Sequence, residues 1–280
     1  MRTPRGLLAF VVGAGLAVAG TVIQAVVRNP LGDPYLLGIV PGASAGAMLV
    51  IVFGSGAAAG LSLGSAAFIG AMIAFVATFA LSRQGGRWPP TRLILAGVAV
   101  GYLLSSVTFY LQSLATPNQL AGALFWTLGS VSSARWSQLA LPSVVVVAAT
   151  VWLLLQGRRL NALVTGEETA ASLGINVTRF QFVLMTLTSL VTGVIVAVAG
   201  GIGFVGLMVP HLVRLLVDAD HRRVLIASAL LGSVFLLAAD IAARTIRAPV
   251  ELPIGVVTAA VGAPFFLWLM RTQLSAARGH

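Results

Sequence analysis

The sequence predicts an all-α protein, a polytopic membrane bundle of about nine transmembrane helices. Hydrophobic residues make up 58% of the 280 residues and charged residues only 9%, whereas a soluble protein carries roughly 25% charged residues. The mean hydropathy is +1.00. Apolar runs of about 20 residues, the length that crosses a bilayer, recur along the whole chain. We therefore expect one transmembrane domain, residues 1–280, without a sizeable soluble domain.

Short stretches rich in Gly, Pro or Arg separate the predicted spans, which cover residues 6–27, 35–53, 62–82, 93–114, 137–155, 180–200, 204–217, 224–243 and 252–270. The seventh is short and bounded by glycines, so we expect a half-span or a re-entrant segment. The first resembles a secretory signal in position, but its apolar run is too long, and we interpret it as a true span. Asn29-Pro30 and Asp33-Pro34 are expected to end it, since proline removes a helix donor.

All 17 basic residues are arginines. They flank the apolar runs singly or in pairs, which is typical of the positive-inside rule rather than of a nucleic-acid surface. If the chain starts outside, the outer side holds Arg2, Arg5, Arg135, Arg244 and Arg247, and the inner side holds Arg28, Arg83, Arg87, Arg92, Arg158, Arg159, Arg179, Arg214, Arg222, Arg223, Arg271 and Arg278. This asymmetry predicts a cytoplasmic C-terminus.

The composition argues against several activities. Without any Lys, the chain cannot hydrolyse ATP through a P-loop, which needs that residue to hold the phosphates. There is no Cys, and His211, His221 and His280 are not grouped with carboxylates, so we expect no metal site and no cofactor bound by this chain. Neither paired carboxylates nor a Ser-His-Asp set indicates an enzyme. An ion-coupled carrier would place carboxylates within its spans, and only Asp240, near a span end, approaches that pattern.

The longest polar stretch, residues 157–179, predicts a cytoplasmic loop with a short helix at 165–174. Thr165 and Glu168 have the spacing of a capping box, and Gly174 suits the end of a helix. The spacing alone leaves two interpretations open, a plain solvated loop and an element that docks onto a partner.

Three other patterns concern packing. Asp240 needs a partner near the membrane, and Arg244 lies one helical turn later. The small-residue runs 13–15, 42–46 and 97–101 favour close helix contacts. Ala-Val-Ala-Gly occurs at 17–20 in the first predicted span and at 197–200 in the sixth, and these two spans cross the membrane in opposite directions. The halves are then inverted repeats, unless this match in an Ala- and Val-rich chain is coincidence.

Several motifs together resemble a known family. Glu168-Thr-Ala170-Ala171-Ser-Leu-Gly174 resembles the Glu-Ala-Ala loop that permeases of ABC importers insert into their ATPase subunit. The likeness to the FecCD family, which includes permeases for ferric siderophores, haem and cobalamin, extends along the chain in the motifs Arg2-Thr-Pro-Arg5, Asn29 to Gly38, Pro41 to Gly46, Gly203 to His211, Asp240, Glu251 to Thr258 and Gly262-Ala-Pro264.

The resemblance implies the type II ABC importer permease fold. Members of the family usually have ten spans, with a cytoplasmic N-terminus and one helix ahead of the Arg-x-Pro-Arg motif. Here Met1 lies one residue before that motif, so the sequence lacks a counterpart of the family's first transmembrane helix. A misassigned start codon, a truncation or a native nine-span form would each account for the difference.

The resemblance also implies roles for individual residues. Coupling to the ATPase is assigned to Gly166, Glu167, Glu168, Thr169, Ala170, Ala171, Ser172, Leu173 and Gly174. Docking of the periplasmic binding protein is assigned to Arg2, Arg5 and Arg244. The first two, three apart on a helix, are expected to point outward, and anchoring to lipid headgroups is the alternative for all three. Structural or pathway roles are assigned to Asn29, Pro30, Pro210, His211, Glu251 and Pro253, with His211 expected to be a structural hydrogen-bonding residue.

The implied function is that of a permease subunit in the bacterial inner (plasma) membrane. Two copies, or a heterodimer with a paralogous permease, form the pathway. Two separate ABC ATPase subunits hydrolyse ATP, so this chain is not itself an enzyme. A periplasmic or lipid-anchored binding protein delivers the substrate, expected to be a ferric siderophore, with haem or cobalamin as alternatives. The alternative from another class is an ion-coupled secondary transporter.

Overall fold

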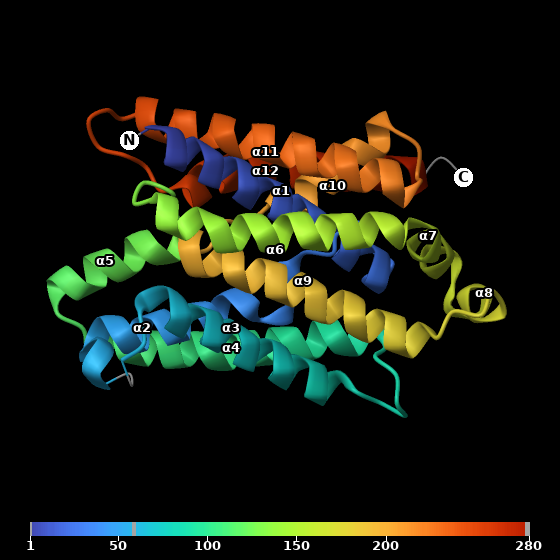
Figure 1. The fold of residues 1–280 in the computed structure, drawn as a ribbon, viewed down its shortest axis with the longest axis horizontal. Helices are drawn as coiled ribbons and strands as arrows, with labels where there is room; N and C mark the ends of the chain where they lie inside the picture. The colour runs from blue at the N-terminus through green and yellow to red at the C-terminus, as the bar shows by residue number, and fades with distance from the viewer. Residues whose placement is uncertain (1, 58–59, 278–280) are drawn as a thin grey trace.

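The computed structural model describes residues 2–57 and 60–277, which form a bundle of helices aligned along one long axis (Figure 1). Each predicted span has a helical counterpart: α1 (Arg2–Val27), α2 (Ile39–Ala57), α3 (Leu63–Ser82), α4 (Pro90–Ser113), α6 (Trp136–Leu155), α9 (Val177–Ala199), α10 (Val205–Leu216), α11 (His221–Thr245) and α12 (Ile254–Ala277). Within the described ranges there is no strand, and the one extended pairing is an isolated bridge between Gln84 and Arg87.

The spans differ in length. Among the described residues, α1, α3, α4, α6, α9 and α11 are the 6 helices long and apolar enough to cross a membrane. Shorter apolar helices cover Ile39–Gly54, Val205–Leu216 and Ile254–Leu269. The short seventh span is confirmed, because α10 has only 12 residues. In α2 the helical backbone is interrupted at Gly54, whose φ is 80°.

Four smaller helical segments connect the spans: η1 (Pro34–Leu37), α5 (Pro117–Thr127), α7 (Gly157–Thr165) and α8 (Glu167–Ser172). The sequence prediction omitted α5, although its start carries a recognisable signal. Thr116 and Gln119 form a capping box, and Pro117 follows at the first helical position. In Figure 1, α5 lies at one end of the bundle and α8 at the other, and we call these the α5 end and the α8 end.

Helix α1 forms the centre of the bundle, since 78% of its most apolar window is buried. It packs closely along α11, where a methyl group on Gly13 would overlap the carbonyl of Gly232, and one on Gly232 would overlap that of Gly13. A similar close approach joins Gly42 of α2 to Gly70 of α3. The packing role predicted for the small-residue runs is therefore confirmed at these helix pairs.

Helix α9 occupies a position in the second half of the chain that corresponds to that of α1 in the first half, but it runs in the opposite direction. The two helices carry the Ala-Val-Ala-Gly copies and run in opposite directions along the bundle (Figure 1). Helix α1 packs on α10 and α11, and α9 packs on α2 and α3. Because α2 and α3 follow α1 in the chain as α10 and α11 follow α9, the two halves use the same order of contacts. The inverted-repeat interpretation is supported over coincidence.

The chain between α1 and α2 turns back into the bundle. Arg28 adopts a left-handed conformation, with φ of 50°, and Asn29 accepts hydrogen bonds from Leu31 N at 2.9 Å and Gly32 N at 3.0 Å. Asp33 then caps η1 by accepting a bond from Tyr35 N at 2.8 Å. The prediction that the Asn29-Pro30 region ends the first span is confirmed.

Candidate functional site

Helix α8 projects beyond the end of the bundle (Figure 1). Gly166, with φ of 136°, allows a sharp turn from α7 into α8, and Gly174, with φ of 77°, ends the segment. The exposed side chains include Glu168, Thr169, Ala171, Ser172 and Leu173. The projecting segment therefore exposes one alanine and one leucine beside acidic and hydroxyl groups.

The local capping prediction is wrong in part. Thr165 ends α7 instead of starting α8, and its hydroxyl donates to Ala162 O at 2.8 Å. The position before α8 belongs to Gly166, which has no side chain to cap the helix. Gly174 does end it as predicted, with Gly174 N donating to Ala171 O at 2.9 Å and Ile175 N donating to Ala170 O at 3.1 Å.

Few contacts hold α8 to the bundle. Glu167 forms an ion pair with Arg28 at 3.1 Å, with 30% and 35% of the two side chains exposed, and accepts a hydrogen bond from Gln181 Nε2 at 3.3 Å. Ala170 is the buried member of the helix. Because Arg28 directly follows α1 and Gln181 belongs to α9, Glu167 connects α8 to both of these helices.

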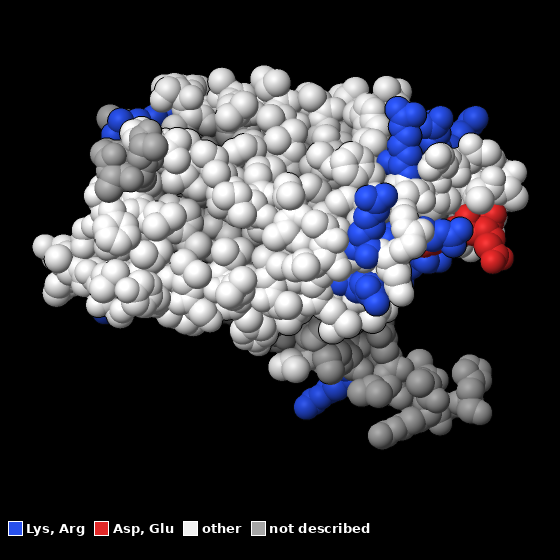
Figure 2. All heavy atoms as spheres, turned by 90° about the horizontal axis from the view of Figure 1, so that it is seen from below, with Lys and Arg blue, Asp and Glu red and all other residues white. Residues whose placement is uncertain are grey.

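Basic side chains concentrate around α8. Figure 2 shows them gathered at the α8 end, with acidic atoms beside them at the tip. The chain directions place there the arginines at the ends of α1, α3, α7 and α11 that were predicted for one membrane side, including Arg28, Arg83, Arg158 and Arg222. Their grouping agrees with the charge asymmetry expected of a cytoplasmic face.

The α5 end holds a second charged group, which joins three parts of the chain. Arg5 of α1 donates to Asp240 of α11 at 2.8 and 2.9 Å and to Glu251, in the loop after α11, at 2.9 Å. Arg244 lies 3.0 Å from the other oxygen of Asp240. The predicted Asp240–Arg244 pair is therefore confirmed, and the hydrogen bond from Arg5 lowers the pKa of Glu251 below its usual value.

The prediction that Arg5 points outward is wrong. Its guanidinium is mostly buried because Asp240, with 1% of its side chain exposed, draws it into the bundle. Isolated buried carboxylates are costly, and the pairing with Arg5 compensates the charge of Asp240. Arg244 is half-buried and Glu251 is 42% exposed. The side chain of Arg2 lies outside the part of the structure that is described.

Near Pro210, a side chain of α1 contacts the backbone of α10. Pro210 has no N–H to donate to the carbonyl of Gly206, one turn earlier in α10. Gln24 of α1 approaches this carbonyl with its Nε2 at 3.4 Å and donates to Leu207 O at 3.1 Å. His211 does not act as the expected structural hydrogen-bonding residue, since its buried Nε2 has no partner among the described residues.

The remaining motif residues have structural contacts. Pro30 is exposed in the turn after α1, and Pro253 accepts a hydrogen bond from Val256 N at 3.1 Å as α12 begins. We find no contact that would give either one a chemical role.

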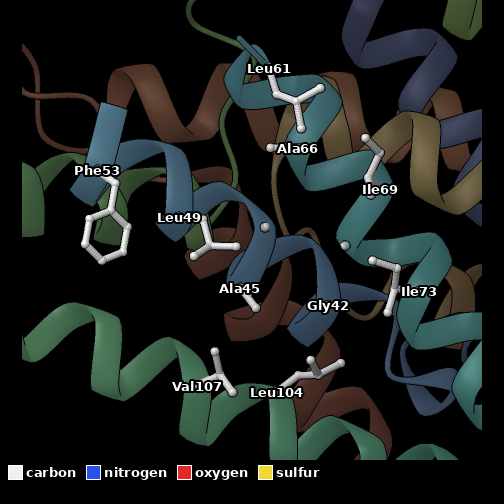
Figure 3. Close-up of a pocket in the computed structure, with 12 residues that line it drawn as sticks. Gly42, Ala45, Leu49, Phe53, Leu61, Ala66, Ile69, Ile73, Leu104 and Val107 are labelled. Atoms are coloured by element: carbon white, nitrogen blue, oxygen red, sulfur yellow. The ribbon is translucent and has the colours of Figure 1, made fainter. Parts of the chain in front are cut away.

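An apolar groove lies between α2, α3 and α4, with a volume of about 490 Å³. Figure 3 shows Leu49 and Phe53 of α2 on one side, Ile69 and Ile73 of α3 on another, and Leu104 and Val107 of α4 opposite them. The lining contains aliphatic and aromatic groups and glycine, so the groove can accept apolar atoms but cannot fix a charged ligand. Within residues 2–57 and 60–277, no cluster of three His, Cys, Asp or Glu could hold a metal ion.

A membrane bundle with inverted halves and a projecting helix, in a chain that has no P-loop lysine, agrees with the permease class of ABC importers. The profile of the FecCD transport family matches residues 1–272, and the chain belongs to this family. Permease subunits of this class use the ATPase of a partner and work with a substrate-binding protein.

Curated relatives and a solved structure agree with this assignment. The chain is 43% identical over 276 residues to the hemin transport system permease protein HmuU of Yersinia pestis, covering 98% of this chain and 82% of that protein. It is 42% identical over 273 residues to the cobalamin import system permease protein BtuC of Halobacterium salinarum, covering 98% and 73%. An inward-facing metal-chelate type ABC transporter has a TM-score of 0.88 and 33% identity, covering 97% of this chain and 86% of that one.

Proposed function

We propose that the chain is the permease subunit of an importer for ferric siderophores in the bacterial inner membrane, with the α8 end and the C-terminus in the cytoplasm. The observation that carries the proposal is α8, a short helix that projects from an otherwise membrane-embedded bundle and exposes Glu168, Ala171 and Leu173. The arginines around it support the cytoplasmic assignment.

We propose that an ATPase subunit binds α8 through residues 166–174. When two ATPase subunits close on ATP, they would displace α8 and, through Glu167 and Arg28, the end of α1. Because α1 packs against α9, α10 and α11, a shift at its end would also move these three helices. This route gives a physical link between an external ATPase and the access of the pathway.

At the α5 end we propose that the binding protein docks on Arg244, Glu251 and Arg2. Arg5 would act through its bonds to Asp240 and Glu251, by holding α1, α11 and the following loop in one arrangement. Exposed charges of both signs suit a partner that associates and dissociates in each cycle, since surface ion pairs contribute about 1 kcal/mol or less each.

We propose that two copies form the pathway, with a paralogous heterodimer as the alternative. Large apolar and aromatic side chains are exposed along α4 and α5, including Tyr102, Phe109, Tyr110 and Phe125. A second copy and lipid are the two surroundings in a membrane that can cover such faces.

The cargo is proposed as a ferric siderophore, which belongs to the metal-chelate class named for the similar structure. Haem and cobalamin are also metal chelates, and the relatives named for them support these alternatives equally. An ion-coupled transporter is disfavoured because the acidic residues lie at the ends of the bundle or in connecting segments.

The test is uptake of radiolabelled ferric siderophore into proteoliposomes that contain this chain, its ATPase and its binding protein. We expect ATP-dependent uptake that Glu168→Arg abolishes. Asp218→Arg is the matched control, because it makes the same charge change at an exposed site of the α8 end outside α8, and it should transport normally. Unlabelled haem and cobalamin are added as competitors.

The outcomes separate the parts of the proposal. Uptake that survives Glu168→Arg would contradict the coupling role of α8. Uptake of haem or cobalamin in place of the siderophore would correct the cargo and leave the permease mechanism intact. Uptake driven by an ion gradient without ATP would favour the carrier alternative.

A further inference from the structure

A cavity with several polar residues in its lining lies beside α7, between the end of α1 and the facing ends of α10 and α11. Its volume is about 230 Å³, and it is lined by Gln24, Ala25, Arg28, Asn29, Pro30, Val164, Arg214 and His221. Arg28, Pro30 and Val164 are exposed at its mouth, whereas Gln24 and His221 are 3% and 4% exposed. The cavity therefore leads from the surface of the α8 end to buried polar groups.

Arg214 supplies a positive charge to this cavity without a compensating carboxylate. Among the described residues, none of the ion pairs includes Arg214. Its polar partner is the neutral side-chain oxygen of Gln24. The amide of Gln24 is held in this orientation because its Nε2 faces the carbonyls of Gly206 and Leu207. A half-buried guanidinium has five N–H donors, so most of them are left for a ligand.

His221 also lines this cavity and carries a buried acceptor nitrogen. Its Nδ1 lies 2.7 Å from Asn161 Oδ1, which cannot donate, so Nδ1 carries the proton in this bond. Asn161 is oriented in turn by donating from its Nδ2 to Asp220 Oδ1 at 2.9 Å. The other ring nitrogen, Nε2, is buried and has no partner in the described part of the chain. Buried polar atoms normally have one.

The carboxylates near the cavity do not cancel its charge. Glu167 is paired with Arg28 at 3.1 Å, and Asp220 accepts hydrogen bonds from Asn161 and from Arg222 N. Arg214 remains the uncompensated charge. A ligand must thus bring negative oxygens for Arg214 and, for a neutral His221, a proton that it can share with Nε2.

We propose that this cavity binds a phosphate group that keeps an ionisable proton, supplied by a lipid headgroup of the phosphate-monoester type or by free phosphate. A phosphate monoester offers anionic oxygens together with a second ionisation near pH 6, so it can present both kinds of group at neutral pH. Sulfate and carboxylates carry no such proton. The bound phosphate connects α1, α10 and α11 directly below the α8 attachment, which makes the site a means of setting the position of the coupling segment.

The test uses the full chain purified in detergent and measures its thermal unfolding midpoint. One series adds inorganic phosphate or sulfate at constant ionic strength, and another adds short-chain phosphatidic acid or phosphatidylcholine. We expect a saturable rise with inorganic phosphate, with phosphatidic acid or with both, and none with sulfate or phosphatidylcholine. A response to the lipid alone identifies a headgroup site, and a response to inorganic phosphate identifies a site open to the soluble ion.

Two arginine variants make the test specific to the cavity. In Arg214→Gln the affinity should fall at least about tenfold, because a charge-assisted bond is lost. Arg92→Gln removes an exposed arginine of the same end, from α4, and should bind as the unchanged protein does. If Arg214→Gln is not monodisperse, His221→Gln takes its place, again with weaker binding expected. The absence of a saturable shift, or equal affinity in the cavity variant, would mean that water alone fills the cavity and would overturn the proposal.

Discussion

The two ends of the bundle hold their charged residues in opposite ways. At the α8 end, Glu167 pairs with Arg28 and Asp218 pairs with Arg223, and both ion pairs are at least partly exposed. At the α5 end, Arg5 joins α1, α11 and the loop after α11 through the buried Asp240. A surface pair stabilises by about 1 kcal/mol or less, whereas breaking a buried pair costs roughly 3–5 kcal/mol. The difference indicates that side-chain ion pairs hold the α5 end more firmly than the α8 end.

Helices α1 and α11 pack closely along each other and connect the two ends of the bundle, so the first prediction concerns this contact. Gly232→Val would put side-chain atoms into the carbonyl of Gly13 and the methyl group of Ala17. Because backbone atoms cannot move aside cheaply, we expect a loss of more than about 3 kcal/mol of unfolding free energy and poor membrane yield. Thermal unfolding of the purified chain measures the effect. Gly122→Val, in open space on α5, should change it little, and equal losses in both variants would refute the packing argument.

We expect the next largest effect at the α5 end, from loss of the ion pair between Arg5 and Asp240. Arg5→Met removes the guanidinium and leaves Asp240 with Arg244 alone. Because Asp240 is buried, we expect the free energy of unfolding to fall by about 2 kcal/mol. The comparison is with Arg247→Met, which removes an exposed arginine of the same end. If both variants unfold alike, the ion-pair group does not hold the α5 end.

At the α8 end we expect a smaller loss of unfolding free energy, together with a measurable change in hydrogen exchange. Glu167→Gln weakens the pair with Arg28 and should cost less than about 1 kcal/mol. Hydrogen exchange of the backbone amides of residues 166–174 should nevertheless become faster, because α8 loses its ionic attachment. Unchanged exchange in α8 would show that Ala170 and Gln181 hold the helix without the ion pair.

The smallest effect concerns pH. Hydrogen bonds from Arg5 and Asn161 lower the pKa values of Glu251 and Asp220, respectively. A carboxyl group with a lowered folded-state pKa stabilises the fold above its unfolded value, about 4, and this contribution is lost as the pH falls through the folded value. We expect the unfolding midpoint to decrease from pH 5 to pH 3. In Arg5→Met the decrease should be smaller, and an identical pH profile would contradict the role of Glu251.

Local sequence patterns predicted the positions of the helices better than they predicted which side chains contact one another. The nine apolar runs, the short α10, the helix near residue 170 and its end at Gly174 follow from composition and short-range spacing. Thr165 was assigned to the wrong helix because Gly166 allowed the chain to turn one residue later. Helix α5 was omitted because its polar start concealed a short helix, although Thr116 and Gln119 have the capping-box spacing.

The sequence by itself determined that this is a helical membrane protein with asymmetric charge and a polar segment at one end, because hydropathy and local spacing act over one or two helical turns. It also placed Arg244 next to Asp240. Only the tertiary structure decided that Arg5 turns inward to Asp240 and Glu251, 235 and 246 positions away, and that Arg214 and His221 face one cavity. Such contacts depend on how the helices cross, since long-range packing sets which faces meet.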